Sequence, residues 1–412
     1  MSLEADFVLR GAGRLVTCDA GRGEGALGVV ERGALAAREG LVVWAGAERE
    51  LAGAVRVLPG AVQEEAGGMA VLPGLVECHS HLVFGGDRRQ EFTARMGGEA
   101  YRTGGIMATV RATRQASDAE LVELSRARLD RFLAHGVTTV EAKSGYGLTP
   151  EGEARLVRLA AGLGHEVRVV VTVLAAHVVP DEQRDRPDAY VEAVCESLLP
   201  AVRGLAEFCD AWCDEGAFTP GQCRRVLARG RELGMAPKLH ADQLSAAGGA
   251  RLAAEVGAVS ADHLEHVTEE DAGRLAEAGT TAVLIPGASM MTRSARAPAR
   301  MLLERGVRVA LSTDLNPGSS YSENLQLVAA LGCAELGMTV EEAILGITRH
   351  AAAALGREGR AGVLRPGAAC DAVVLDSRSE VDLAYHYGVN LAARVILAGR
   401  PVGAAEGAPG RA

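Results

Sequence analysis

Lysine is almost absent from this sequence of 412 residues, because it occurs only at positions 143 and 238. Nearly all of the positive charge is therefore arginine, and any chemistry that needs a lysine must use one of these two. The formal net charge is −10, and the sequence pI is about 5.6. Without a basic stripe, such a chain is poorly suited to bind nucleic acid or an anionic membrane, so we expect neither partner.

Paired cysteines and long apolar runs are also lacking. The eight cysteines form no CxxC pair, and several lie in apolar segments where a free thiol behaves as a small hydrophobic side chain. A disulfide framework does not fit this size and spacing, so we expect a reducing, cytoplasmic setting. The first six residues show no basic region followed by an apolar block, and no run is long enough to span a bilayer.

Aromatic residues make up only 3% of the chain, whereas hydrophobic residues make up 48%. The core must therefore rest on alanine, valine and leucine. A chain of this length suits either a large barrel with an appendage or two to three domains. A GxGxxG fingerprint, which would favour a doubly wound dinucleotide-binding sheet, is missing as well.

The order of the predicted elements favours the barrel. Residues 1 to 65 read as short strands broken by glycine, which indicates a small all-β unit. From about residue 71, apolar strands alternate with helices whose N-caps are recognisable at Ser117, Thr149 and Thr219. Eight strands are predicted there, at 71–78, 137–140, 167–174, 206–213, 236–239, 258–261, 281–285 and 307–311. Eight βα units in succession indicate an α/β fold of the (β/α)8, TIM-like type, with function on the loops after the strands.

The last part of the chain returns to strands, at 370–375 and 393–397, without long helices between them. We expect both ends of the chain to combine into one small β-sandwich domain beside the barrel. The predicted boundaries are 1–68 for the N-terminal part of the sandwich, 69–358 for the barrel, 359–404 for the C-terminal part of the sandwich, and 405–412 for a tail expected to be disordered.

The first predicted barrel strand ends in His79-Ser80-His81. Alternate side chains of a strand share a face, so both imidazoles can point at one atom. Such a pair alone is a weak signal, because two exposed histidines often lie together without a role. Further histidines follow or end other predicted strands, so that six of the ten gather at one rim, at positions 79, 81, 177, 240, 263 and, less clearly, 266.

Three histidines and an aspartate suit a mononuclear divalent metal site that keeps an open position for water. We assign His79, His81, His240 and Asp314 as its ligands, and both zinc and iron remain open. Each residue alone has an ordinary alternative, such as a core histidine or an aspartate that caps a turn. Residues 206–215, the predicted fourth strand, contain no lysine that could be carboxylated to bridge a second metal, so we expect one metal per chain.

These motifs resemble a known family. Pro73-Gly74 followed by His79-x-His81, with the later histidines and Asp314, is similar to the metal-dependent amidohydrolase superfamily. Within it, five segments resemble the imidazolonepropionases, which open 4-imidazolone-5-propanoate hydrolytically to N-formimidoyl-L-glutamate in histidine degradation. The segments are HLVFGGDR (81–88), EAKSGYGL (141–148), KLHADQ (238–243), SADHLE (260–265) and STDLNPGS (312–319). The resemblance runs from about residue 70 to 400 and implies a distorted barrel with a composite β-sandwich.

The resemblance also implies roles for single residues. Asp314 would accept a proton from the metal-activated water and return it to the leaving ring nitrogen, while His263 would polarise the carbonyl oxygen. Arg88 would clamp the propionate carboxylate, because a guanidinium matches a carboxylate in two places. The other implied substrate-binding residues are Tyr146, His177, Asn316, Gly318 and Ser319.

Two departures from the family pattern are visible. Gln243 belongs to the implied catalytic set but stands where many members have glutamate, and an amide can orient water or substrate without being able to take a proton. The segment 101–106 reads as shorter than the family's loop, which would change the lid of the pocket. For Asn316, a turn-forming role beside Pro317 and Gly318 is the ordinary alternative.

Other functions stay open at this point. Another mononuclear amidohydrolase, such as a nucleobase-type deaminase, would keep the same metal set, although an uncharged ring needs no carboxylate clamp. A non-catalytic relative that has lost its ligands is a further alternative, against which the four filled ligand positions argue. We expect a small-molecule substrate, and a homodimer is one option for the oligomeric state.

Overall fold

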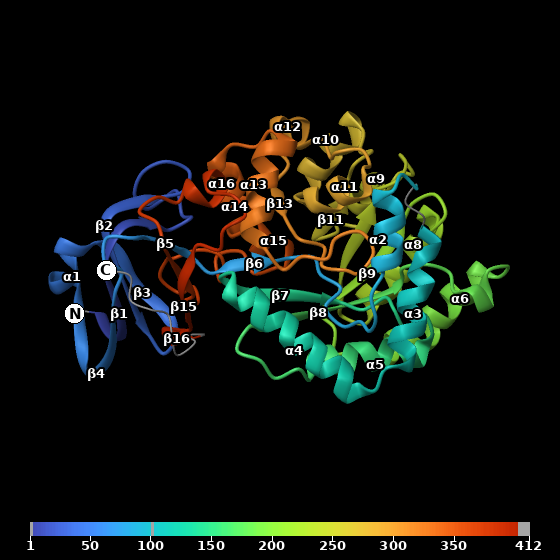
Figure 1. The fold of residues 1–412 in the computed structure, drawn as a ribbon, viewed down its shortest axis with the longest axis horizontal. Helices are drawn as coiled ribbons and strands as arrows, with labels where there is room; N and C mark the ends of the chain where they lie inside the picture. The colour runs from blue at the N-terminus through green and yellow to red at the C-terminus, as the bar shows by residue number, and fades with distance from the viewer. Residues whose placement is uncertain (1–2, 100–102, 403–412) are drawn as a thin grey trace.

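The computed structural model describes residues 3–99 and 103–402, which form two eight-stranded sheets. In Figure 1 the sheet that contains the first and the last described strands lies at one end of the molecule, beside the helix-covered sheet. The predicted fold class is confirmed, because a TIM-like α/β barrel stands next to a mixed sheet built from both termini.

The terminal sheet has the strand order β16-β15-β14-β5-β1-β2-β3, and β4 pairs with β1 in parallel. Its core joins the two ends of the chain, since Phe7 and Leu35 share one buried cluster with Val374 and Ile396. The strands are β1 (Leu3–Val16), β2 (Val29–Arg38), β3 (Leu41–Ala47), β4 (Val55–Glu65), β5 (Ala70–Pro73), β14 (Ala372–Leu375), β15 (Ala392–Leu397) and β16 (Arg400–Val402).

The barrel sheet follows chain order from β6 to β13, and all its neighbouring strands are parallel. Each of the eight predicted barrel strands overlaps an observed one. The strands are β6 (Leu75–Glu77), β7 (Val137–Lys143), β8 (Arg168–Ala176), β9 (Phe208–Cys213), β10 (Ala236–Ala241), β11 (Ser260–His263), β12 (Thr281–Leu284) and β13 (Val309–Leu311).

The barrel closes around the buried carboxyl group of Glu77. This group accepts hydrogen bonds from the backbone N–H groups of His79 and Thr313, both at 3.0 Å, and from the hydroxyl of Ser312. Beyond the strand ends, Ser80 and Leu315 form a parallel bridge. Burial raises the pKa of Glu77 to about 7, although the hydrogen bonds act in the opposite direction. A side chain thus joins β6 to the chain after β13.

The predicted helix caps are present. Ser117, Thr149 and Thr219 each accept a hydrogen bond from the backbone N–H three residues later, and a proline follows the last two.

The long loop expected between β6 and β7 contains helices α2 and α3. The α-helices are α1 (Glu48–Ala54), α2 (Arg89–Met96), α3 (Ile106–Gln115), α4 (Asp118–Ala134), α5 (Pro150–Ala161), α6 (Pro187–Ala193), α7 (Leu199–Ala201), α8 (Pro220–Glu232), α9 (Gly249–Glu255), α10 (Glu269–Ala278), α11 (Pro286–Thr292), α12 (Ala299–Glu304), α13 (Leu325–Leu336), α14 (Val340–Gly346), α15 (Arg349–Ala354) and α16 (Asp382–Tyr385). Short helical turns are η1 (Thr103–Gly105), η2 (Asp181–Gln183) and the π-type η3 (Val194–Leu198).

The single strand predicted over residues 71–78 is in fact two strands in two sheets. β5 pairs with β1 and β14 of the terminal sheet, whereas β6 pairs with β7 of the barrel. The chain passes between the sheets at Gly74, whose N–H donates to the carbonyl of Asp371 at 2.9 Å. Hydrophobic character could not reveal this division, because both strands are buried and apolar.

Gly74→Ala is expected to destabilise the protein by about 1 to 3 kcal/mol, because a Cβ at this position would lie 2.3 Å from Oγ1 of Thr138. Urea unfolding at equilibrium measures the loss. Thr138→Ala removes the two nearest atoms, so the double variant should recover part of the stability that the single variant loses. A loss as large in the double variant as the sum of the single losses would contradict this account.

Several expectations concern the chain as a whole. All eight cysteines are free, and seven of them are buried. Within residues 3–99 and 103–402, no helix is both long and apolar enough to cross a membrane. The domain boundaries at 68, 358 and 404 stay a prediction, and β5 leads us to propose Gly74 as the passage between the units. The predicted tail, 405–412, and Tyr101 of the shortened loop lie outside the described residues.

Candidate active site

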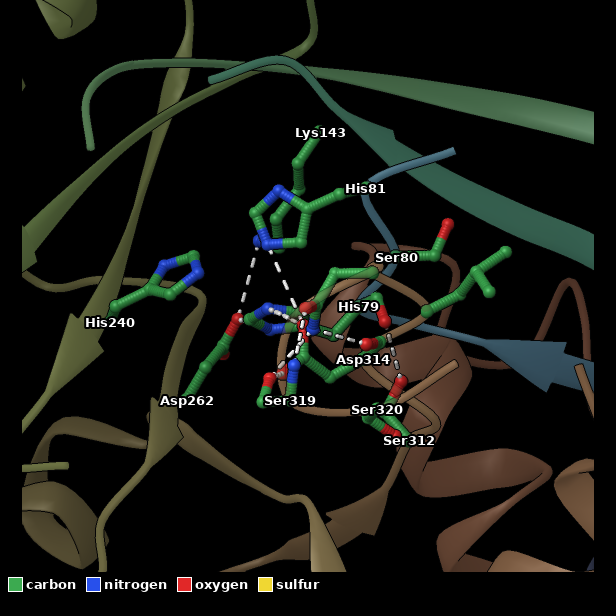
Figure 2. Close-up of polar contacts among 12 residues, drawn as sticks. His79, Ser80, His81, Lys143, His240, Asp262, Ser312, Asp314, Ser319 and Ser320 are labelled. Atoms are coloured by element: carbon green, nitrogen blue, oxygen red, sulfur yellow. Dashed lines mark hydrogen bonds and ion pairs between the residues drawn. The ribbon is translucent and has the colours of Figure 1, made fainter. Parts of the chain in front are cut away.

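His79 and His81 lie just beyond the end of β6, and both side chains are buried. The strand-like alternation continues past β6, since Ser80 between them points away and donates to the carbonyl of Glu141. The Nε2 atoms of His79 and His81 each lie 3.5 Å from Oδ1 of Asp314. The two imidazoles thus meet at a carboxylate from the loop after β13, as Figure 2 shows.

His240 and His263 extend this cluster from the ends of β10 and β11. The ring centroid of His240 lies 4.5 Å from that of His79, and His263 lies 5.3 Å from both. In the described part of the chain, Nε2 of His79 and Nε2 of His240 are buried and have no hydrogen-bond partner. Buried imidazole nitrogens without a partner, next to a carboxylate, fit the coordination of a divalent transition metal.

The potential ligand atoms form two close groups, each of which could hold an ion. Those of His79, His81 and Asp314 lie within 4.8 Å of one another, and so do those of His79, His240 and His263. All four predicted ligands therefore belong to two overlapping groups around His79. His263, predicted to act beside the metal, belongs to one of these groups together with His79 and His240.

A buried set of charged residues lies behind the histidines, and the sequence had not indicated its role. Asp262 Oδ2 lies 2.7 Å from Nδ1 of His79, and Asp210 Oδ2 lies 3.1 Å from Nδ1 of His240. Nζ of Lys143 contacts both carboxylates, at 3.2 and 2.6 Å. A carboxylate at Nδ1 favours the tautomer in which Nε2 carries the lone pair that binds a metal.

Both lysines of the chain belong to this set. Lys143 and Lys238 are buried and both contact the carboxylate of Glu141, at 3.2 and 2.9 Å. Burial lowers the pKa of Lys143, but Asp210, Glu141 and Asp262 raise it by more, so that it lies well above the ordinary value. The signal in the sequence was a charged residue inside an apolar strand, which occurs here on β7, β9, β10 and β11.

Asp314 is held in a tight loop. Its backbone has φ of 50°, which is a strained conformation for aspartate. Asn316 stabilises the loop, because Nδ2 donates to the carbonyl of Asp314 at 2.7 Å and Oδ1 accepts from the N–H groups of Gly318 and Ser319 at 2.8 and 2.9 Å. The turn-forming role considered for Asn316 is therefore present in the structure, beside any contact with a substrate.

Two site residues have raised pKa values, for different physical reasons. Burial raises the pKa of Asp314 to about 7, against the effect of nearby His263. For His263, burial lowers the pKa, but the carboxylate of Glu265, whose Oε1 lies 3.8 Å from Nδ1, outweighs this effect, so the pKa is raised. A divalent cation beside Asp314 would lower the pKa of its carboxyl group.

One cavity connects the histidine cluster with the predicted substrate-binding residues. Ten of the residues that line it were singled out from the sequence, namely His81, Arg88, Tyr146, His177, His240, Gln243, His263, Asp314, Asn316 and Ser319. Ile106 and Trp212 also line it and were missed, because apolar residues carry no motif for a binding site. His79 is fully buried below the cavity, and His266 is exposed and not among its lining residues.

Arg88 and the stacked rings of His177 and His81 form part of the cavity wall. Arg88 is buried and bonds through Nε and Nη2 to Oε2 of Glu91, at 3.0 and 2.5 Å. Gly318 packs so closely that a Cβ would lie 2.1 Å from Nη1 of Arg88. The ring of His177 stacks on His81 with centroids 5.1 Å apart, and burial lowers the pKa of His177 to about 4.

Comparisons with known proteins agree with this site. Residues 70–402 match the model of the amidohydrolase family. The chain is 45% identical to the imidazolonepropionase of Symbiobacterium thermophilum over 410 residues, which cover 96% of each chain. It is likewise 45% identical to that of Geobacillus kaustophilus, over 91% of each chain.

Proteins with much lower sequence identity have a similar fold. A crystal structure of an adenosine deaminase from Xanthomonas campestris with bound zinc has a TM-score of 0.72 at 19% identity, with 97% of this chain and 93% of the other covered. The match in sequence with the two bacterial relatives is closer and nearly complete. The chain belongs to the amidohydrolase family and, within it, to the imidazolonepropionases.

Proposed function

We propose that this chain hydrolyses 4-imidazolone-5-propanoate to N-formimidoyl-L-glutamate. The observation that carries the proposal is a single cavity with a buried histidine and aspartate cluster at its base and Arg88 in its wall. The cluster suits hydrolysis of a cyclic amide, and a buried guanidinium suits the propionate carboxylate of this substrate. Membership of the imidazolonepropionases supports the same reaction.

One divalent metal per chain, zinc or iron, is the second part of the proposal. His79, His81, His240 and Asp314 would hold it, because they present buried nitrogen and oxygen atoms to one region. A metal bound there lowers the pKa of water and withdraws electrons from the carbonyl group under attack. The surrounding carboxyl groups, among them Asp210, outnumber the two buried lysines, so a cation also reduces an excess of negative charge.

Within this cavity, Asp314 would transfer the proton and His263 would stabilise the carbonyl oxygen. Water adds its oxygen to the ring carbonyl carbon, the bond from that carbon to the ring nitrogen breaks, and the nitrogen gains a proton. Asp314 carries this proton, and we assign the transfer to Oδ2, because Oδ1 faces His79 and His81 whereas Oδ2 lies 3.4 Å from Oγ of Ser319. His263 donates to the carbonyl oxygen as negative charge develops on it.

The remaining lining residues would bind and orient the ring. Tyr146 and His177 lie over His81 and would contribute hydrogen bonds to the substrate. Gln243 would orient the ring through its amide, and it needs no proton-transfer role when Asp314 has one. Gly318 would allow Arg88 to lie close to the loop, since any side chain there would occupy the same space.

Removal of the metal provides the test of the active site. Dialysis against a chelator is expected to abolish hydrolysis, and one equivalent of zinc or iron should restore it. Elemental analysis measures the stoichiometry, and the loss of absorbance of the imidazolone ring measures the rate. Full activity after complete metal removal, or a requirement for two equivalents, would contradict the proposed centre.

The competing function is deamination of a nucleobase-like ring by the same metal set. Arg88 argues against it, because a guanidinium in the cavity wall suits a substrate carboxylate, and a nucleobase ring carries none. Kinetic constants for 4-imidazolone-5-propanoate, cytosine and guanine separate the two, and turnover of the bases alone would overturn our choice. A cytoplasmic location and a homodimer remain predictions from the sequence.

A further inference from the structure

We propose that Lys143 is a positioning residue whose ammonium group acts as a built-in cation, holding Asp210 and Asp262 against the two metal-binding histidines His240 and His79. The inference rests on the metal site of the proposed function, and it extends that site to a residue on β7 that touches neither metal nor substrate. Figure 2 shows Lys143 in contact with Asp262, beside His79 and His240.

The contacts have the same form on both sides of the ammonium group. Oδ2 of Asp262 lies 3.2 Å from Nζ of Lys143 and 2.7 Å from Nδ1 of His79. Oδ2 of Asp210 lies 2.6 Å from the same Nζ and 3.1 Å from Nδ1 of His240. One oxygen of each carboxylate is thus shared between the ammonium group and one imidazole.

This arrangement places a carboxylate oxygen beside Nδ1 of each histidine. Nδ1 of His79 forms a hydrogen bond with Asp262 at 2.7 Å, whereas Nδ1 of His240 makes a 3.1 Å contact with Asp210 that is not a hydrogen bond. A carboxylate at this position favours the tautomer that carries its proton on Nδ1. In that tautomer Nε2 of His79 and Nε2 of His240 keep their lone pairs for a metal, and neither nitrogen has a hydrogen-bond partner among the described residues.

The cation between the carboxylates is also needed on electrostatic grounds. Asp210, Asp262 and His240 have potential ligand atoms within 4.8 Å of one another, a spacing that would attract a cation. All of these side chains are buried, where two unpaired carboxylates would repel each other strongly. Lys143 supplies the positive charge at this place from within the chain.

Lys238 offers a matched comparison. It is buried to the same degree and also bonds to Glu141, but its other hydrogen bonds go to the carbonyl groups of Cys78 and Ala354, at 3.3 and 3.2 Å. Replacing either lysine by methionine removes one buried charge from one network. Only the change at Lys143 removes the contact shared with the two carboxylates.

The experiment compares K143M, K143R and K238M as full-length, metal-free proteins without substrate. Competition with a chromophoric chelator measures zinc affinity, and the visible absorption of the cobalt-loaded proteins reports the ligand geometry. We expect K143M to bind zinc about 10 to 100 times more weakly than the unchanged protein and to show a shifted cobalt spectrum. K143R should recover most of the affinity, and K238M should stay within about threefold of the unchanged protein.

Equal zinc affinity in K143M and the unchanged protein would overturn the inference, and so would equal weakening in K143M and K238M. If K143M does not fold, D210N replaces it, because it removes the charge that Lys143 holds while leaving the lysine in place. Weaker zinc binding by D210N supports the inference, and unchanged binding overturns it. A chain that binds one zinc but leaves the imidazolone intact would overturn the proposed function alone.

Discussion

Asp314→Asn is expected to lower kcat by about three to four orders of magnitude, the largest effect that we expect from a single exchange. Asparagine has nearly the same size, but it cannot accept the proton of the attacking water. It is also a weaker metal ligand than a carboxylate. Steady-state kinetics of metal-loaded enzyme measures the change, with metal content determined on the same sample.

Ser319→Ala is the matched control for this exchange, because Oγ of Ser319 lies 3.4 Å from Oδ2 of Asp314. Its loss should reduce kcat by less than about tenfold, since one weak hydrogen bond to the carboxylate is removed. If metal-loaded D314N kept kcat within tenfold of the unchanged enzyme, Asp314 could not be the residue that carries the proton.

The pH dependence of the reaction follows from the same carboxyl group. Burial raises the pKa of Asp314 to about 7, and only the ionised form can accept a proton. The rate should therefore fall as the pH decreases through this value. A bound divalent cation stabilises the ionised form, so the metal-loaded enzyme should lose activity at a lower pH than 7.

Arg88→Met is expected to reduce kcat/KM by about a thousandfold, mostly through KM. The exchange keeps much of the aliphatic side chain but removes the charged donors that would hold the propionate. With an analogue in which the carboxylate is a neutral amide, the same variant should lose much less, because that ligand has no charge to pair. Comparison of the two ligands separates loss of recognition from general damage to the pocket.

Arg89→Met is the control, since Arg89 is the neighbouring residue, its side chain is 85% exposed and it pairs with Asp87. Equal losses for the acid and the amide with Arg88→Met would show that Arg88 does not recognise the carboxylate. Glu91 bears on the same test, because its carboxylate holds Nε and Nη2 of Arg88 before a substrate arrives. An arginine held in place loses less conformational freedom when it binds.

Most of the barrel could be predicted from the sequence, because the hydrophobic periodicity of each strand or helix, its caps and the positions of the loops depend on neighbouring residues in the chain. Val137–Lys143 and Pro220–Glu232 are recognisable from their own residues, and the histidines at the strand ends follow from the parallel arrangement. The division at Gly74 was missed, because it depends on Thr138 and Asp371 from distant parts of the chain.

The charged residues behind the metal site were missed for a related reason. Asp210 and Lys143 stand on different strands, and only the closed barrel brings Oδ2 and Nζ within 2.6 Å. In the sequence each is a single charge in an apolar run. Trp212 and Ile106 could not be assigned to the cavity either, since their side chains would be equally suited to the core.

The two buried lysines also determine how the folded chain meets reagents that react with amines. Neither Lys143 nor Lys238 reaches the surface, and the sequence contains no other lysine. Acylating reagents, and enzymes that acetylate or ubiquitinate lysine, therefore find no lysine target on the native protein. Once the barrel opens, both amines become available, so covalent labelling of these two positions would report unfolding against a background close to zero.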